Sequence, residues 1–469
     1  MPFTALIFLS CFLPIYMVVV AVTRGAVANW AILALSLLFY LWGAPTFLPV
    51  ILGLGVLDFV VARYIHARRG QPSARRALIA VVVVHLAILA YFKYANFFVG
   101  QLNDVRDVFG YTAWQWTKVI LPIGISFLTF EEISFMVDVY RGDAVPPKTP
   151  RDYWLFLMLF PHSIAGPIFR WKDLEGQLRQ RSWSMAMFAE GTSRFCWGLG
   201  KKLLIGDALA IVANQAFAGP SDQLTPAVAW IGALAYTIHI YFDFSGYSDM
   251  AIGLGKMAGF TFKENFRDPY TSQSITEFWT RWHISLSTWF RDYVYIPLGG
   301  NRDGERRTKR NVLLVFALSG FWHGASWTFL AWGLYHGGWV MLERGAWASA
   351  LRARLPRVAR HVLTMVIVVF GWVLFRAESF GQAADFARAM VGLGPATSVA
   401  PVVWGEFLPH RSEAFAVLAI ATVAWRALRQ DRPRDYLANL RLIAAPIILL
   451  LCFMQVLNAT FIPLIYFKF

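Results

Sequence analysis

Apolar runs that approach membrane-crossing length follow one another along almost the entire chain, separated by short polar segments. A helix needs about 20 mainly apolar residues to cross a bilayer, and fewer where helices are short and paired. The runs that fit are 3–22, 28–42, 46–62, 77–99, 120–139, 152–168, 186–216, 226–244, 311–342, 360–376, 412–428 and 442–462. Several contain glycine or proline, so a run such as 311–342 can contain a break. The pattern predicts an all-α polytopic membrane protein.

Residues 274–300 depart from this pattern, because they are rich in aromatic side chains but too polar to cross a membrane as an ordinary helix. At 100° per residue, one face carries Ile275, Phe278, Trp279, Trp282, Leu286, Trp289, Phe290 and Tyr293. The opposite face is polar, so we expect the segment to lie in the interface or to line a cavity, with His283 at the edge of the apolar stripe. Residues 299–310 predict a turn and then a basic loop at the cytoplasmic surface.

Composition supports the membrane assignment and limits the partners. Hydrophobic residues make up 57% of the 469 residues and charged residues 15%, whereas soluble domains carry roughly a quarter charged residues. The net charge of +15 comes largely from short basic loops such as 63–76, 344–360 and 426–441, which are typical of the cytoplasmic side of a membrane protein. We therefore predict a membrane-lipid environment and no nucleic-acid partner. Three passes before the first basic loop place the N-terminus outside the cytoplasm.

Two histidines lie in the run 311–342, which contains no Asp, Glu, Lys or Arg. Gly320 and Gly324 flank His323, and such small residues allow close approach and a break in the helix. His323 could serve as a general base, since an unperturbed imidazole has a pKa of about 6.5, or could equally hold a neighbouring helix by a hydrogen bond. His336 lies about 220° around an unbroken helix from His323, which favours a structural role.

Polar residues also follow the apolar run that begins at residue 226. They are Asp243, Ser245, Ser248 and Asp249. One interpretation is a turn at Ser245 and Gly246, with Asp249 capping the next helix. The other is that these side chains line a tunnel reached by His323. Spacing does not decide between them.

Several common catalytic motifs are absent from the sequence. There is no HExxH motif, no pair of histidines four residues apart, and no clustering of Cys11, Cys196 and Cys452, so we predict no metal site. GxSxG is missing, and residues 253–259 lack the ending of a phosphate-binding loop. The remaining chemistry is histidine-assisted group transfer, or none.

Three long motifs carry a resemblance to a known family. They are "YFDFSGYSDMAIGLGKMAGF" (241–260), "NFRDPYTSQSITEFWTRWHISLSTWFRDYVYIPLGGNR" (265–302) and "FALSGFWHGASWTFLAWGLYHG" (316–337). Together they resemble the core of the membrane-bound O-acyltransferase family, in particular its bacterial branch of alginate O-acetyltransferase membrane subunits. Residues 121–142, 160–170 and the ending "YFKF" fit the same branch. The resemblance covers most of 120–345.

The resemblance implies a bundle of about 11 to 12 tilted and re-entrant helices around a central tunnel. It implies one integral membrane domain, with N-terminal helices in 1–119, the catalytic core in 120–345 and C-terminal helices in 346–469. His323 corresponds to the family's catalytic histidine, as a general base or as the group that polarises the attacking hydroxyl, and His283 to its second histidine. The tunnel residues would be Asp243, Ser245, Arg281, Trp282, Trp322, His162 and His336. At the position of His162 the branch more usually has glutamine.

The resemblance also implies the reactants. A thioester donor, acetyl-CoA, would supply the acyl group from the cytoplasm without any bound cofactor, and the basic segment 302–310 could meet its phosphates. The acceptor would be an extracytoplasmic polysaccharide such as alginate, reached through an SGNH-type periplasmic acetyltransferase, in the bacterial inner membrane. D-alanyl transfer from a carrier protein is an alternative. A saccharide or proton transporter or flippase is another, but neither an internal repeat nor an acidic residue near His323 supports it.

Overall fold

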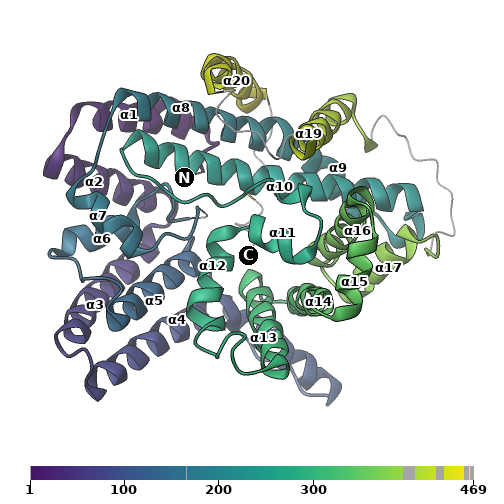
Figure 1. Cartoon of the computed structure of the whole chain (residues 1–469), viewed down its shortest axis with the longest axis horizontal. Coiled ribbons are helices and arrows are strands. Elements are labelled where there is room, and N and C mark those ends of the chain that lie inside the picture. The colour runs from purple at the N-terminus through teal and green to yellow at the C-terminus, as the bar shows by residue number, and fades with distance from the viewer. Residues whose placement is uncertain (1, 165, 395–406, 429–437, 459–463, 465–469) are drawn as a thin grey trace. The chain divides into compact units, whose positions relative to one another are not determined.

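The computed structural model describes residues 2–164, 166–394, 407–428, 438–458 and 464 (Figure 1). Within these ranges the chain is helical and contains no strand, which confirms the all-α prediction. Part of the basic loop 426–441, the end of the run 442–462 and the ending "YFKF" lie outside the described residues. In the described ranges, six helices are long and apolar enough to cross a membrane: Gly25–Gly43, Pro45–Ala67, Pro72–Val108, Pro226–Met257, Arg357–Arg376 and Leu440–Asn458.

The chain divides into two compact units. One comprises Met1–Thr192 with Ala251–Lys263, and the other comprises Ser193–Met250 with Glu264–Phe469. The first unit contains the helices up to α7 and the beginning of α8, and the second contains the helices from the end of α8 onward, apart from the end of α10.

Helices of the first unit begin with a π-helical turn, η1 (Phe8–Phe12), that continues into α1 (Leu13–Val22). They continue with α2 (Gly25–Gly43), η2 (Pro45–Phe47), α3 (Leu48–Ala67), α4 (Pro72–Val108), α5 (Ile125–Arg141), α6 (Pro150–Met158) and α7 (Trp171–Arg179). Figure 1 shows α3, α4 and α5 packed together, and α5 is almost completely buried. Since α6 ends at Met158 and the chain then turns, the prediction of one spanning run over 152–168 is wrong. Pro161 and Pro167 explain the ending, because proline cannot continue a helix.

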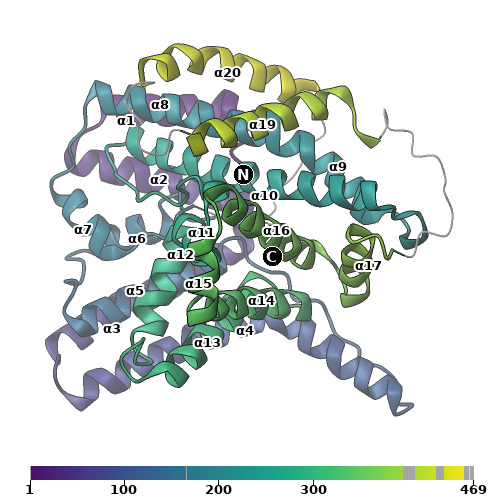
Figure 2. The same cartoon turned by 45° about the vertical axis from the view of Figure 1, so that its right-hand side comes forward.

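The second unit is built around long helices joined by short ones. The bounds are α8 (Met185–Gly200), the π-helical η3 (Lys201–Gly206), α9 (Asp207–Ala218), η4 (Ser221–Gln223), α10 (Pro226–Met257), η5 (Pro269–Thr271), α11 (Ile275–Arg281), α12 (Ile284–Phe290), η6 (Arg291–Tyr295), α13 (Glu305–His323), α14 (Trp327–Glu343), α15 (Ala346–Arg354), α16 (Arg357–Arg376), α17 (Phe380–Met390), α19 (His410–Leu428) and α20 (Ala438–Asn458). Figure 2 shows α19 and α20 beside the continuous segment α8–η3–α9, which both helices contact.

Helix α10 corrects one of the two interpretations of the polar residues after position 242. The helix continues from Pro226 to Met257, so neither the turn at Ser245 and Gly246 nor the cap at Asp249 exists. Gly246 instead faces Gly198 of α8, where an added Cβ would lie 2.6 Å from the Gly198 carbonyl oxygen. The glycine therefore allows two helix backbones to approach each other, and it does not form a turn.

Helices α13 and α14 form a hairpin from the run 311–342, which confirms that this run is broken. The break lies at Gly324, where the backbone is extended before Ser326 caps α14 through the Thr328 amide. Gly320 and Gly333 face each other across the hairpin, and a Cβ on Gly333 would collide with the Phe316 carbonyl oxygen. Helix α13 already begins at Glu305, so the predicted basic loop over 299–310 is partly helix.

We predict that Gly333→Ala destabilises the protein, because the Cβ meets the backbone of α13, which cannot move aside as a flexible side chain can. Overpacking of this kind costs on the order of 1–3 kcal/mol. Thermal unfolding of the detergent-solubilised protein, followed by tryptophan fluorescence, measures the loss. Gly338→Ala is the matched control on the same helix, because its Cβ would meet nothing within 4 Å. Equal melting temperatures for the two variants would contradict this account of the hairpin.

Candidate functional site

His323 is the last residue of α13 and lies directly before the break at Gly324. Its side chain is buried, and aromatic rings surround it: the ring centroids of Trp322, Trp332 and Phe375 lie 5.0, 5.1 and 5.5 Å from that of the imidazole. The last carbonyl groups of a helix have no hydrogen-bond partner within that helix. The break at Gly324 therefore places the imidazole next to such carbonyl groups. The contacts of the imidazole described here are therefore mainly with aromatic rings.

His283 lies at a second break in the same unit, between α11 and α12. Its φ of 43° is a left-handed conformation, which is uncommon for a residue other than glycine. The amide of Ile284 donates to the Asn265 carbonyl oxygen at 2.9 Å, and the His283 Nδ1 lies 3.1 Å from the Asn265 side-chain oxygen. Asn265 Nδ2 donates to the Ser248 hydroxyl at 3.1 Å, which orients the amide so that its oxygen faces the imidazole. His283 Nδ1–H is then the donor, which leaves the lone pair on Nε2.

The electrostatic surroundings keep His283 neutral. It lies outside the six helices that are long enough to cross a membrane, and burial lowers its pKa to about 3. Desolvation disfavours the charged imidazolium because water no longer solvates it. The imidazole is therefore unprotonated at Nε2 throughout the physiological pH range.

The structure brings His283 and His323 together within one unit. Their ring centroids are 6.5 Å apart, and Trp322 lies 6.4 Å from His283 and 5.0 Å from His323. The two helix breaks thus present two imidazoles and one indole at the same place.

His336 and Trp282 belong to an aromatic cluster that continues from this point. Trp332 lies between the two histidines of the hairpin, 5.1 Å from His323 and 5.2 Å from His336. His336 is fully buried, and within the described residues neither of its ring nitrogens has a hydrogen-bond partner. Trp282 packs at 4.8 Å against Trp372. An imidazole buried without a partner is unusual, because an unmade hydrogen bond costs free energy.

Three further predicted residues have different surroundings. Asp243 forms an ion pair with Lys202 at 2.7 Å, and Lys202 also pairs with Asp207. Asp243 therefore belongs to a buried group of one lysine and two aspartates. Arg281 pairs with Glu277 at 2.8 Å along its own helix. Ser245 is buried, and its hydroxyl has no hydrogen-bond partner among the described residues. Ser245 is the only one of the three without a bond at its polar atoms.

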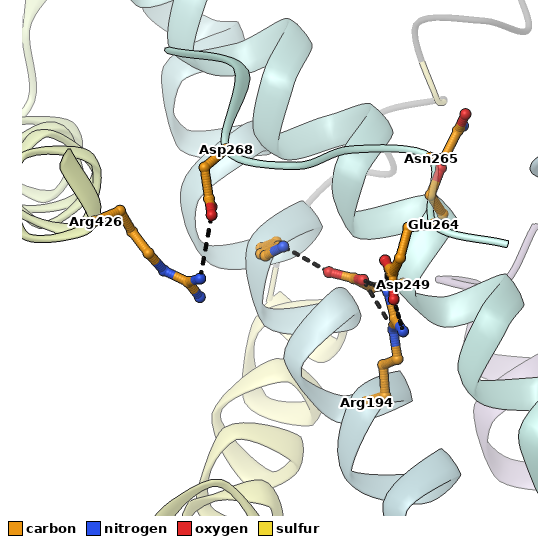
Figure 3. Close-up of polar contacts among 8 residues, drawn as sticks. Arg194, Asp249, Glu264, Asn265, Asp268 and Arg426 are labelled. Atoms are coloured by element: carbon orange, nitrogen blue, oxygen red, sulfur yellow. Dashed lines mark hydrogen bonds and ion pairs between the residues drawn. The ribbon is translucent and has the colours of Figure 1, made fainter. Parts of the chain in front are cut away.

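An ion-pair cluster that the sequence reasoning missed supports Asn265 (Figure 3). Arg194 donates to Asp249 at 2.8 and 3.0 Å and forms a bidentate ion pair with Glu264 at 2.6 and 2.7 Å. Lys201 adds a second cation on Asp249 at 2.5 Å. Glu264 directly precedes Asn265, so the cluster fixes the segment that orients His283. The "NFRDPY" motif was the only signal for Asn265 in the sequence.

His162 belongs to the first unit, whereas the other predicted residues belong to the second. Its Nδ1 lies 2.9 Å from the Glu131 carboxylate, which also accepts the Phe169 amide at 3.1 Å. The neighbouring Glu132 lies 3.1 Å from His85. The pairing of these two histidines with glutamates was not predicted from the sequence.

The group around His85 also contains the described side chains that could hold a metal ion. Asp58, His85 and Glu132 offer ligand atoms that all lie within 4.8 Å of one another. The two ring nitrogens lie 2.7 Å from Asp58 and 3.1 Å from Glu132, and Tyr153 donates to Asp58 at 2.7 Å. Carboxylates lie beside both ring nitrogens, so the arrangement is a buried triad in which the imidazole is held between two carboxylates.

Comparison with known proteins supports the family resemblance. Residues 148–380 match the membrane-bound O-acyltransferase family (MBOAT). The chain is 47% identical over 395 residues to the "Probable alginate O-acetylase AlgI" of Pseudomonas aeruginosa, covering 84% of this chain and 75% of the relative. It is 34% identical to the peptidoglycan O-acetyltransferase of Helicobacter pylori over 83% and 80% of the two chains, and 28% identical to the teichoic acid D-alanyltransferase of Bacillus subtilis over 56% and 70%. The chain therefore belongs to the membrane-bound O-acyltransferase family and is a multi-pass membrane enzyme of the acyltransferase class.

Proposed function

We propose that the protein transfers an acetyl group from acetyl-CoA, taken up on the cytoplasmic side, for the O-acetylation of an extracytoplasmic polysaccharide such as alginate. The observation that carries the proposal is the pair His323 and His283, buried 6.5 Å apart at two helix breaks of one unit. The names of the relatives, which refer to alginate, peptidoglycan and teichoic acid, support a cell-envelope acceptor. An SGNH-type periplasmic partner would complete delivery to the polysaccharide, and the location would be the bacterial inner membrane.

In the proposed reaction, His323 accepts the proton of the attacking hydroxyl. The hydroxyl oxygen then forms a bond to the thioester carbonyl carbon, and the bond from that carbon to sulfur breaks as the tetrahedral intermediate collapses. The proton on His323 passes to the departing thiolate, so the imidazole returns to its neutral state. General-base assistance of this kind contributes on the order of 10²–10⁴ in rate.

His283 is proposed to position a reactant and not to carry the proton. Its Nδ1–H is committed to Asn265, so Nε2 can accept one hydrogen bond from a hydroxyl group. The rings of Trp322, Trp282 and Trp332 would exclude water, which protects the thioester from hydrolysis. His336 and Ser245 are proposed to line the path of a substrate, because their buried polar atoms lack protein partners in the described part of the chain. Asp243 and Arg281 would hold its walls through their ion pairs.

We predict that His323→Ala lowers acetyl transfer from acetyl-CoA on the order of 10²–10⁴-fold while leaving donor binding intact. The measurement follows radiolabelled acetyl leaving the donor, with the protein in nanodiscs and cell-envelope extract as acceptor. His410→Ala is the matched control, because that imidazole is exposed on α19 beside Glu413 and lies outside the proposed site. Turnover that survives in His323→Ala would disprove its role as base. Wild type that neither binds nor consumes acetyl-CoA would instead favour an acyl carrier protein as donor.

We predict that Asn265→Asp gives acetyl transfer a new dependence on pH. A carboxylate beside His283 Nδ1 favours the imidazolium and so raises the pKa of His283 from its value of about 3. As the pH falls through the raised pKa, Nε2 gains a proton and can no longer accept a hydrogen bond. The rate of the variant should therefore decrease as the pH falls below about 6, where wild-type His283 stays neutral.

The control for this experiment is Asn265→Ala, which removes the oxygen without adding charge. It should lower the rate at every pH and leave the shape of the profile unchanged. Superimposable profiles for wild type and Asn265→Asp would show that Asn265 has only a structural role.

A further inference from the structure

A positively charged pocket lies in the first unit, and none of the residues that line it belongs to the proposed site. It encloses about 570 Å³ of empty space, part of it open to the exterior. The ends of α1, α2, α7 and α10 line it, together with the segment between α7 and α8. Its polar lining includes Arg24, Asn29, Arg179, Gln180 and Arg181, and no acidic residue is among the described residues that line it.

Two of these arginines lack a carboxylate partner among the described residues. Arg24 donates only to the backbone oxygens of Val20 and Thr23, at 3.1 and 2.7 Å, and its guanidinium lies 4.0 Å from the Trp183 ring centroid. Arg181 lies over Phe260 at 4.8 Å, and its buried Nη1 has no hydrogen-bond partner in the described part of the chain. Both guanidinium groups are thus held in place by apolar and backbone contacts while their charges stay unneutralised.

The two charges also act on each other. Burial lowers the pKa of Arg181, and the nearby charge of Arg24 acts in the same direction. Like charges that converge in a cavity raise the free energy of the unoccupied state, which an anion would relieve. The N-terminus of α2 adds to this field, since Gly25 and Ala28 line the pocket and a helix N-terminus favours negative charge.

The position of the pocket in the chain indicates the side of the membrane from which an anion would reach it. Arg24 lies at one end of α2, and the turn 68–71 follows α3, so two passes return the chain to the same side of the membrane. That turn belongs to the basic loop 63–76, which is typical of the cytoplasmic side. The pocket therefore opens at the cytoplasmic interface, where lipid headgroups and soluble phosphate esters are both present.

We propose that this pocket binds a phosphate group through Arg24 and Arg181. A guanidinium presents paired N–H donors that match two phosphate oxygens. Trp183 and Phe260 restrict both side chains to positions at the pocket, so little side-chain freedom is lost on binding. The phosphate belongs either to an anionic phospholipid or to a soluble ester such as coenzyme A.

The test uses the full chain in phosphatidylcholine nanodiscs and measures binding without turnover. One arm titrates phosphatidylglycerol and counts lipid retained on the protein by native mass spectrometry. The other compares coenzyme A with dephospho-coenzyme A, which lacks the 3′-phosphate. We expect one arm to show binding that Arg24→Gln with Arg181→Gln weakens at least about tenfold, which corresponds to about 1.4 kcal/mol. Arg388→Gln is the control, because that arginine is exposed on α17 beside Asp385.

Each outcome decides the proposal. Loss confined to phosphatidylglycerol identifies a lipid site, and loss that requires the 3′-phosphate identifies a soluble ester. Unchanged binding in the double variant, or an equal loss in Arg388→Gln, overturns the proposal. If the double variant does not fold, Thr23→Glu supplies the missing counter-charge beside Arg24 and should abolish the same binding. His323→Ala should bind like wild type, so failure of the proposed reaction would remain distinguishable from failure of this site.

Discussion

Asp249 accepts hydrogen bonds from Arg194 and Lys201, and Arg194 also holds Glu264, so two cations and two carboxylates neutralise one another within a membrane protein. Their side chains are 19–38% exposed, and charges that are partly removed from water are costly unless they are paired and hydrogen-bonded. This requirement fixes α8, α10 and the segment after α10 at one point of the second unit. Asn265 follows Glu264, and Asn265 in turn determines the tautomer of His283. The geometry of the candidate site thus depends on an ion pair that does not touch it.

Close helix packing provides the second constraint on the site. Gly320 and Gly333 allow α13 and α14 to approach backbone to backbone, and Gly198 and Gly246 do the same for α8 and α10. Within lipid there is little hydrophobic driving force between helices, so small residues at the contact contribute through dispersion. Helix α13 ends at His323, at the turn of the hairpin, so the imidazole lies next to the last carbonyl groups of that helix. Large aromatic rings fill the remaining space and keep both imidazoles buried.

The first unit satisfies the same electrostatic requirement in another way. Glu131 and Glu132 are adjacent on the buried helix α5, and each faces its own histidine, His162 or His85. An isolated carboxylate at this depth would be expensive, and an imidazole beside it provides either a donor or a compensating charge. At the position of His162, a histidine therefore keeps a partner for Glu131. Arg24 and Arg181 in the pocket of the first unit have no such carboxylate partner among the described residues, which is why we propose an external anion for them.

The sequence by itself determined the helical class, the membrane environment and the family, because hydropathy and long ordered motifs are local properties of the chain. It allowed a break in the run 311–342, which the structure places at Gly324. It also indicated His323 as a candidate, since an imidazole between glycines in an uncharged run fits a general base and a helix–helix hydrogen bond equally well, and the family resemblance favoured the base. Only the tertiary structure decided which polar groups are partnered. Lys202 pairs with Asp243 across 41 positions and Asn265 orients His283 across 18, so no local period records either contact. For the same reason the sequence suggested a turn at Gly246: a glycine needed for close helix packing and a glycine needed for a turn look identical until the neighbouring helix is in place.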